Sequence, residues 1–320
     1  MIDTCEMLPE KVQCLTRRTS GRLRVAYLVG TGHCGSSLMA LLMDSHPQIV
    51  SVGEVSPGRR SRHVAFETQS CSCGVILNEC PFWTHVFDAM RQQGFASPWA
   101  HDYRYAGTLA HRVLTAYSSY RLAQWFQRTC AEILPYHRQR IRRVDRANVA
   151  FISSALKWKG AEVFVDTTKT LTRLSRLLGI NELDVQIIRV VRDVRAFVNS
   201  NQRKGRSLAA SAESWTKFQQ TADAFLRQIS QDKIIQIRYE DLCDDMAGTL
   251  ARLFDFLGVE PMEPNEIVTP REHHILGNRM RRQLQLTVRR DDAWRKDLLP
   301  SEIDRTLRIG GPINQRFGYR

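Results

Sequence analysis

A single short segment restricts the possible folds of this chain more than any other. Residues 24–30 (RVAYLVG) form an apolar, partly β-branched run that ends at Gly30, which is typical of a buried strand. Residues 36–45 place Leu38, Leu41 and Leu42 on one face of a helix. The sequence GTGHCGSS, residues 30–37, joins the two. We expect a strand, a tight loop and a helix, an arrangement whose exposed backbone N–H groups bind phosphate.

Further strand-sized apolar runs indicate the class of fold. They occupy residues 49–52, 162–165, 185–191 and 234–237, and the last three precede a polar turn and a segment with helical period. Strands that alternate with helices favour a parallel sheet covered on both faces. We therefore predict an α/β fold. Ligands of such sheets bind beyond the carboxyl ends of the strands, and the polar motifs of this chain fall there.

The domain organisation follows from what the chain lacks. Its 320 residues contain no internal repeat, low-complexity tract or Pro/Gly/Ser-rich linker, so a single domain over residues 1–320 is favoured. Helical periodicity between Leu109 and Phe126 indicates helices inserted into the α/β body. We assign about residues 22–55 and 160–282 to the core and about 56–159 to a helical insertion.

The chain is strongly basic. Lysine and arginine outnumber aspartate and glutamate by 46 to 33, which gives a formal net charge of +13 and raises the local concentration of anionic partners. No apolar run reaches the roughly 18–20 residues of a membrane helix, and the N-terminal segment has no apolar signal-peptide core. We expect a cytoplasmic protein without a membrane span, whose eight cysteines are reduced. Its oligomeric state stays open.

The loop has the spacing of a P-loop with one substitution. Ser36 stands where the pattern G-x-x-x-x-G-K-[ST] has lysine, the residue that reaches the β- and γ-phosphates of a nucleoside triphosphate. Its absence disfavours ATP. A glycine-rich turn without a ligand is the alternative interpretation. The candidate phosphate-binding residues are Gly32, His33, Cys34, Gly35, Ser36 and Ser37.

A second candidate phosphate site follows the run that ends at Val191. Arg192 comes directly after this strand, and a helix from about Val194 carries Ser200. A guanidinium group forms bidentate hydrogen bonds with phosphate, and a nearby hydroxyl adds another. The alternative is a surface Arg192–Asp193 pair, worth roughly 0–1 kcal/mol. Two phosphate sites on one sheet edge suggest a nucleotide phosphorylated at two ends.

These motifs together resemble a known family. Residues 29–37, followed by residues 38–47 and 52–54, resemble the 5'-phosphosulfate loop of PAPS-dependent sulfotransferases, and Arg192 with Ser200 resembles their 3'-phosphate motif. Three further stretches are similar to bacterial members in the same order: residues 166–169, 239–242 with 254–258, and 277–281. The resemblance implies a P-loop-type three-layer sandwich with a central parallel sheet and inserted helices. It also implies 3'-phosphoadenosine-5'-phosphosulfate (PAPS) as co-substrate and the bisphosphate PAP as product.

The resemblance also implies roles for individual residues. Glu54 is similar to the catalytic glutamate of the tyrosylprotein branch and is the candidate base, the alternative being a structural carboxylate paired with an arginine. Lys169 is the candidate for stabilising the bridging and sulfuryl oxygens, unless it is an exposed lysine. His33 stands where many members carry arginine or lysine, so it either binds the donor or only shapes the loop. Arg281 is the candidate for a further contact with the 3'-phosphate, whereas we expect Tyr239 to be a packing residue.

Three cysteines cluster in a pattern that does not match a zinc finger. Cys71, Cys73 and Cys80 have C-x-C-x6-C spacing, and His85 or His63 could complete a tetrahedral site. Free cysteine is commonly a small buried hydrophobic residue. We therefore expect buried thiols and no metal.

Two rival functions remain. A small-molecule kinase with a P-loop fold needs a carboxylate for magnesium, and only Asp166 ends a neighbouring strand. A nucleic-acid-binding protein fits the charge, but the arginines are not interleaved with stacking aromatic residues, so no nucleic-acid partner is expected. The acceptor, a hydroxyl or amine of a small molecule, glycan or peptide, is not specified by the sequence; residues of the insertion are expected to line its pocket.

Overall fold

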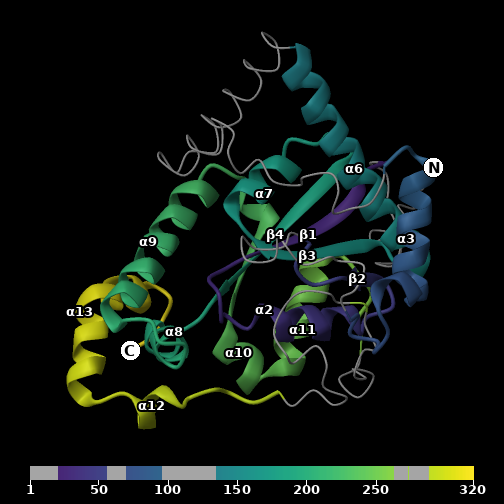
Figure 1. Ribbon diagram of the computed structural model, residues 1–320. Coiled ribbons are helices and arrows are strands. Elements are labelled where there is room, and N and C mark those ends of the chain that lie inside the picture. Colours follow the sequence, from purple (N-terminus) through teal and green to yellow (C-terminus); the bar gives the residue numbers. More distant parts are fainter. Residues whose placement is uncertain (1–20, 56–69, 96–134, 263–272, 274–287) are drawn as a thin grey trace, which may run out of the picture.

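Five parallel strands run through the middle of the molecule (Figure 1). They are β1 (Leu23–Val29), β2 (Ile49–Ser51), β3 (Val163–Lys169), β4 (Leu183–Val191) and β5 (Ile234–Arg238). Their order in the sheet is β2-β3-β1-β4-β5, so the first strand of the sequence lies in the centre. The structure is a computed structural model that describes residues 21–55, 70–95, 135–262, 273 and 288–320.

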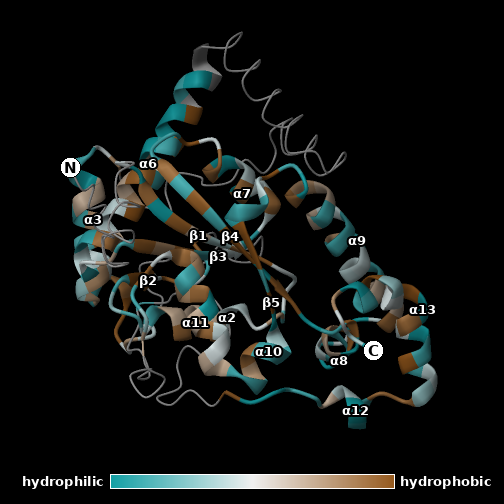
Figure 2. Ribbon diagram, turned by 180° about the vertical axis from the view of Figure 1, so that it is seen from behind, coloured by the Kyte–Doolittle hydropathy of each residue, from teal (hydrophilic) through white to brown (hydrophobic). Residues whose placement is uncertain are grey.

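The side chains of β1 alternate between two hydrophobic clusters, one on each face of the sheet. Val25, Tyr27 and Val29 belong to the first cluster, and Ala26 and Leu28 belong to the second. A strand buried on both faces has no polar alternation, which explains the continuous apolar run in the sequence. Figure 2 accordingly shows the strands largely in the brown of hydrophobic residues.

Helices cover both faces of this sheet and make the fold a three-layer sandwich (Figure 1). The second cluster is covered by α2 (Ser36–Asp44), α10 (Tyr239–Asp244) and α11 (Met246–Leu257). The first is covered by α3 (Pro81–Gln92), α6 (Pro135–Lys159), α7 (Leu171–Leu177) and the end of α9 (Leu208–Leu226). Next to α9 lie α8 (Val194–Gln202) and α13 (Pro300–Arg316), and α12 (Trp294–Asp297) packs against α8. Two short 3₁₀ helices, Leu77–Glu79 and Gln231–Lys233, occur in the connections.

The predicted α/β sandwich with a central parallel sheet is confirmed. One strand is longer than expected, because β3 continues past residue 165 through the polar sequence DTTK to Lys169. Helix α6 lies in the predicted helical insertion, whereas the helix expected between Leu109 and Phe126 falls outside the described residues. Within the described part of the chain, no helix combines the length and the apolar character needed to cross a bilayer.

A buried polar network holds the polar end of β3 in place. Asp166 is fully buried, and its carboxylate accepts a hydrogen bond from Arg173 Nε at 2.5 Å and another from the Thr168 backbone N–H at 2.9 Å. Arg173 is 4% exposed and also donates to the side-chain oxygen of Asn148 on α6 at 2.9 Å. Since a buried charge is costly unless it is paired and hydrogen-bonded, this network lets polar residues continue a buried strand.

Removing one partner of this network is expected to destabilise the fold strongly. Asp166→Ala leaves the Arg173 guanidinium buried without its carboxylate, which costs about 3–5 kcal/mol. The matched control is Asp88→Ala, which breaks the half-exposed Asp88–Arg91 pair on α3 and costs about 0–1 kcal/mol. Urea unfolding followed by circular dichroism measures both variants. Equal losses in the two would show that the buried pair does not stabilise the end of β3.

Candidate active site

The glycine-rich loop lies at the carboxyl end of the central strand, directly before α2. Gly35 precedes the helix with φ 89°, and His33 also has a positive φ of 62°. A Cβ atom on Gly35 would lie 2.4 Å from Cδ2 of Tyr239, so the close approach of the two chains requires glycine. No acidic residue occupies the first turn of α2. The N–H groups of this turn and its helix dipole therefore form an anion-binding concavity.

Two side chains of the loop differ in their availability to a ligand. Cys34 is 1% exposed and packs into the second cluster, and burial raises the pKa of its thiol, so only its backbone is available. Thr31 is buried, and within the described part of the chain its hydroxyl has no hydrogen-bond partner. A buried hydroxyl without a partner is costly. Thr31 therefore offers a hydrogen bond to a bound ligand.

Lys169 and Glu54 meet on the β3 side of the loop. Two hydrogen bonds connect β3 to the chain that follows β2, past the last paired residues of the two strands. The Thr167 N–H donates to the Gly53 carbonyl at 3.2 Å, and the Val55 N–H donates to Thr168 Oγ1 at 3.0 Å. Lys169 turns there with φ 70°. Its ammonium group lies 2.5 Å from Glu54 Oε1 and 3.1 Å from Ser36 Oγ.

The contact between Lys169 and Ser36 explains the missing lysine of the P-loop pattern. Ser36 takes the position at which that pattern has lysine. The ammonium group of Lys169 reaches the same position from β3, the neighbour of β1 in the sheet. The loop therefore has a lysine at its helix start, but a different strand supplies it.

Arg192 lies on the other side of the loop, immediately after β4. Its guanidinium donates to the His33 carbonyl at 2.8 Å and to the Asp291 carboxylate at 2.8 Å, and it stacks on the Tyr239 ring at 4.5 Å from the centroid. Burial is the largest single influence and raises the pKa of the Asp291 carboxyl, but the hydrogen bond and positive charge of Arg192, the Ala293 N–H and the charge of Arg203 together outweigh it and lower that pKa. Asp193 caps the start of α8 by accepting from the Arg195 N–H. The β4–α8 turn thus holds Arg192 against the loop.

Positive charge surrounds the imidazole of His33. Partial burial is the largest cause that lowers its pKa from 6.5 to about 4, and Lys204, Arg192, Arg206 and Lys169 all act in the same direction. The ammonium group of Lys204 lies 3.0 Å from His33 Nε2. Because an ammonium only donates, Nε2 accepts and the neutral ring carries its proton on Nδ1. Such a concentration of cations around a neutral histidine suits a ligand with several negative charges.

The structure brings most of the predicted site residues together at one edge of the sheet. The loop lies between Glu54 with Lys169 on one side and Arg192 on the other. Ser200 lies in the second turn of α8, where its hydroxyl donates to the Ala196 carbonyl within the helix. Arg281 lies outside the described residues.

The sequence interpretation missed three charged residues of this site. Lys204 and Arg206 flank Gly205 just after α8, and this basic turn was a signal, because it follows the helix that begins beside Arg192. Asp291 gave no signal, since it lies far from Arg192 in the sequence and only the fold brings the two together. Tyr239 is buried between Gly35 and Arg192.

Comparison with known proteins shows the family of this chain. The model of the Sulfotransferase family matches residues 26–264, which is most of the chain, and the chain belongs to this family of enzymes. The sulfotransferase domain of the Synechococcus PCC 7002 olefin synthase has a TM-score of 0.51 and 16% identity, over 93% of this chain and 96% of that one.

A second solved structure has the same degree of similarity. The sulfotransferase domain from the curacin biosynthetic pathway has a TM-score of 0.51 and 17% identity, over 93% of this chain and 98% of that chain. At such identities the likeness shows the fold. A search of curated proteins found no match.

The charge around His33 leads to a prediction for its titration. NMR of the histidine ring should give a midpoint near pH 4 in the free protein. Lys204→Ala should raise this pKa towards 6.5, because it removes a cation that repels the imidazolium. Lys217→Ala, which removes an exposed lysine of α9, is the control and should leave the midpoint unchanged. A midpoint near 6.5 in the unaltered protein would refute the electrostatic description.

Proposed function

We propose that this sulfotransferase uses PAPS as donor and transfers its sulfuryl group to a hydroxyl or amine of an acceptor. The observation that carries the proposal is the placement of Lys169 and Arg192. The strands that pair with β1 on either side deliver them to opposite sides of the glycine loop. A donor with charged groups at both its 5' and 3' positions suits this arrangement.

The 5' side of the donor fits the loop. The backbone N–H groups of residues 32–37 form the phosphate cradle, and the unpartnered hydroxyl of Thr31 offers one more hydrogen bond among the described residues. Lys169 stands at Ser36 to neutralise charge on the bridging oxygen and the sulfuryl oxygens. His33 lies at the rim beside Lys204, where a bound anion favours its protonated form.

The 3'-phosphate fits Arg192, which already holds an anionic group. The Asp291 carboxylate forms an ion pair with the Arg192 guanidinium, and the Asp291 side chain is 42% exposed. A phosphate with two negative charges competes with that single carboxylate for the same donors. Lys204 and Arg206 supply further positive charge, and we retain Ser200 and Arg281 as candidate phosphate contacts.

The residues around the transferred group then divide the chemistry between them. When bound, the donor supplies a sulfuryl group whose sulfur–oxygen bond to the 5'-phosphate breaks as the acceptor oxygen or nitrogen attacks in line, leaving PAP. Glu54 takes the proton from the attacking group of the acceptor. Because Glu54 lies beside Lys169, the base and the cation are close together. Lys169 stabilises the charge that develops on the leaving oxygen. No covalent enzyme intermediate is needed.

The rival functions lose their structural support. A kinase needs a carboxylate for magnesium, and the Asp166 carboxylate is fully buried and bonded to Arg173. The cations of the site gather at the strand ends around a loop, which suits a compact anion better than an extended nucleic-acid backbone. The acceptor remains a small molecule, glycan or peptide. Radiolabelled PAPS with fractionated cell extract, followed by mass spectrometry for an added sulfuryl group, would identify it.

Binding of the reaction product tests the role of Arg192. Isothermal titration should show tighter binding of PAP than of AMP, which lacks the 3'-phosphate. Arg192→Ala should weaken PAP binding about 10- to 100-fold and AMP binding little, because hydrogen bonds to charged groups contribute about 1.5–3 kcal/mol. Arg195→Ala removes a neighbouring arginine that pairs with Asp193 and should keep the preference for PAP. An equal effect of Arg192→Ala on both ligands would contradict the assignment.

Turnover tests the role of Glu54. Glu54→Gln keeps the size of the side chain and removes its basicity, so sulfuryl transfer from radiolabelled PAPS should fall about 100-fold or more. Its affinity for PAP should stay within a few-fold of the original, because the proposed base acts on the acceptor. Undiminished turnover would leave Glu54 as the structural carboxylate that pairs with Lys169.

A further inference from the structure

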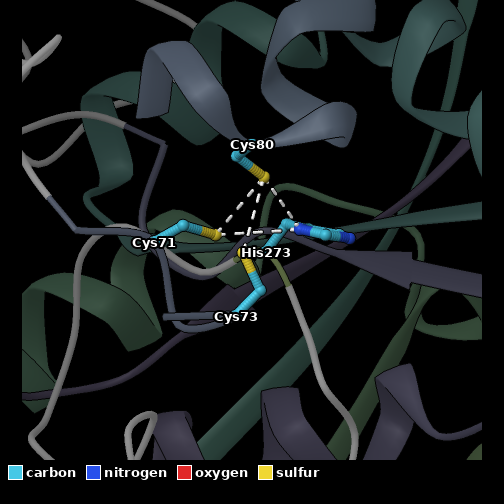
Figure 3. Close-up of side chains that lie close together, drawn as sticks. All are labelled: Cys71, Cys73, Cys80 and His273. Atoms are coloured by element: carbon cyan, nitrogen blue, oxygen red, sulfur yellow. Dashed lines mark hydrogen bonds between the residues drawn. The ribbon is translucent and has the colours of Figure 1, made fainter. Parts of the chain in front are cut away.

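Three cysteines and a histidine that have no role in the proposed active site come together from distant parts of the chain (Figure 3). Cys71 and Cys73 lie in a turn in which the Cys71 N–H donates to the Val75 carbonyl, and Cys80 directly precedes α3. His273 comes from the segment between α11 and α12. In Figure 3 the three sulfur atoms and the imidazole face one another, and all four ligand atoms lie within 4.8 Å of each other.

Three distances between these atoms match the edges of a tetrahedron around zinc, and a fourth, between Nδ1 of His273 and Sγ of Cys80, is shorter by roughly 0.5 Å. With Zn–S of about 2.3 Å and Zn–N of about 2.0–2.1 Å, tetrahedral geometry separates two sulfur ligands by roughly 3.8 Å and sulfur from nitrogen by roughly 3.6 Å. The Sγ atom of Cys80 lies 3.7 Å from that of Cys71 and 3.7 Å from that of Cys73. Nδ1 of His273 lies 3.7 Å from Cys71 Sγ and 3.1 Å from Cys80 Sγ.

We propose that Cys71, Cys73, Cys80 and His273 bind one structural zinc ion. Three thiolates and one imidazole form a complete tetrahedral set, and a set with four protein ligands leaves no position for substrate. The sequence indicated the three cysteines but favoured thiols without a metal. The fourth ligand is His273 rather than His85, and His63 lies outside the described residues.

The surroundings of His273 fix its ring in the ligating orientation. The imidazole stacks on Phe82 with a centroid distance of 4.8 Å and an interplanar angle of 5°. The indole N–H of Trp83 donates to the His273 carbonyl at 3.0 Å. Outer contacts of this kind orient metal ligands before the metal binds. Since Phe82 and Trp83 begin α3 and belong to the first cluster, the ion joins the α3 side of the core to the chain that follows α11.

Two other interpretations fit these four side chains less well. A disulfide has an S–S bond of about 2.0 Å, and it would leave one of the three thiols unpaired. Thiols buried only for packing do not account for an imidazole nitrogen close to two of them. Binding by zinc instead uses all four side chains and releases only the thiol protons, without any oxidant.

Metal content of the protein tests the site directly. The full chain, purified without a histidine tag, should contain about one zinc ion per chain by plasma mass spectrometry. Cys80→Ser and His273→Ala should lose it, whereas the matched controls Cys243→Ser and His85→Asn should keep it. Chelation should lower the melting temperature, and added zinc should restore it. Cobalt in place of zinc should give the thiolate charge-transfer and intense visible bands of a tetrahedral sulfur-rich site.

Several results would overturn the proposal. They are absence of zinc from the unaltered protein, iron with a visible cluster spectrum in its place, a disulfide among the three cysteines by peptide mapping, or full zinc retention in Cys80→Ser. If Cys80→Ser does not fold, the partly exposed Cys73 gives a milder variant, Cys73→Ser. The metal content and cobalt spectrum of the unaltered chain decide the question independently of any variant, and neither depends on which donor the enzyme uses.

Discussion

The parallel pairing of β1 with β3 and β4 is the constraint on which the site depends. In this register Val29 lies beside Lys169, and β4 ends where Arg192 meets the loop. Without this pairing the glycine loop would be a helix start with no side-chain cations around it. The buried Asp166–Arg173 pair belongs to the same constraint, because it holds the polar end of β3 at the edge where Lys169 turns.

In the structure the cations of the site are held by the protein's own groups. Lys169 pairs with Glu54, Arg192 pairs with Asp291, and Lys204 contacts His33. Such partners fix the positions of charged side chains and reduce the entropy lost when a ligand binds. The same pairs oppose binding, since an arriving anion has to displace a carboxylate. If these residues bind the donor as proposed, its affinity is a difference between two sets of ionic contacts.

The sequence predicted the features that depend on local pattern. The run at residues 24–30, the glycine loop and the helix after it sit where the apolar and glycine pattern placed them, and the alternation of strands with helices gave the parallel sheet. Arg192 was expected directly after a strand and lies there, whereas Lys169 ends a strand that is longer than the predicted one. Contacts that join distant parts of the chain could not be predicted. Asp291 pairs with Arg192, and His273 approaches three cysteines, only because the fold brings distant segments together. The periodicity of hydrophobic residues does not predict which distant segments meet.

The lysine that reaches the loop from β3 makes the proposed donor site a product of the tertiary fold. Lys169 and Ser36 are 133 positions apart in the chain, and they meet only when β3 is paired with β1. A peptide containing the loop and α2 would have the glycines and backbone amides but not this charge. Any nucleotide that contacts both residues consequently binds the assembled sheet and not its parts, so its binding energy resists separation of the two central strands.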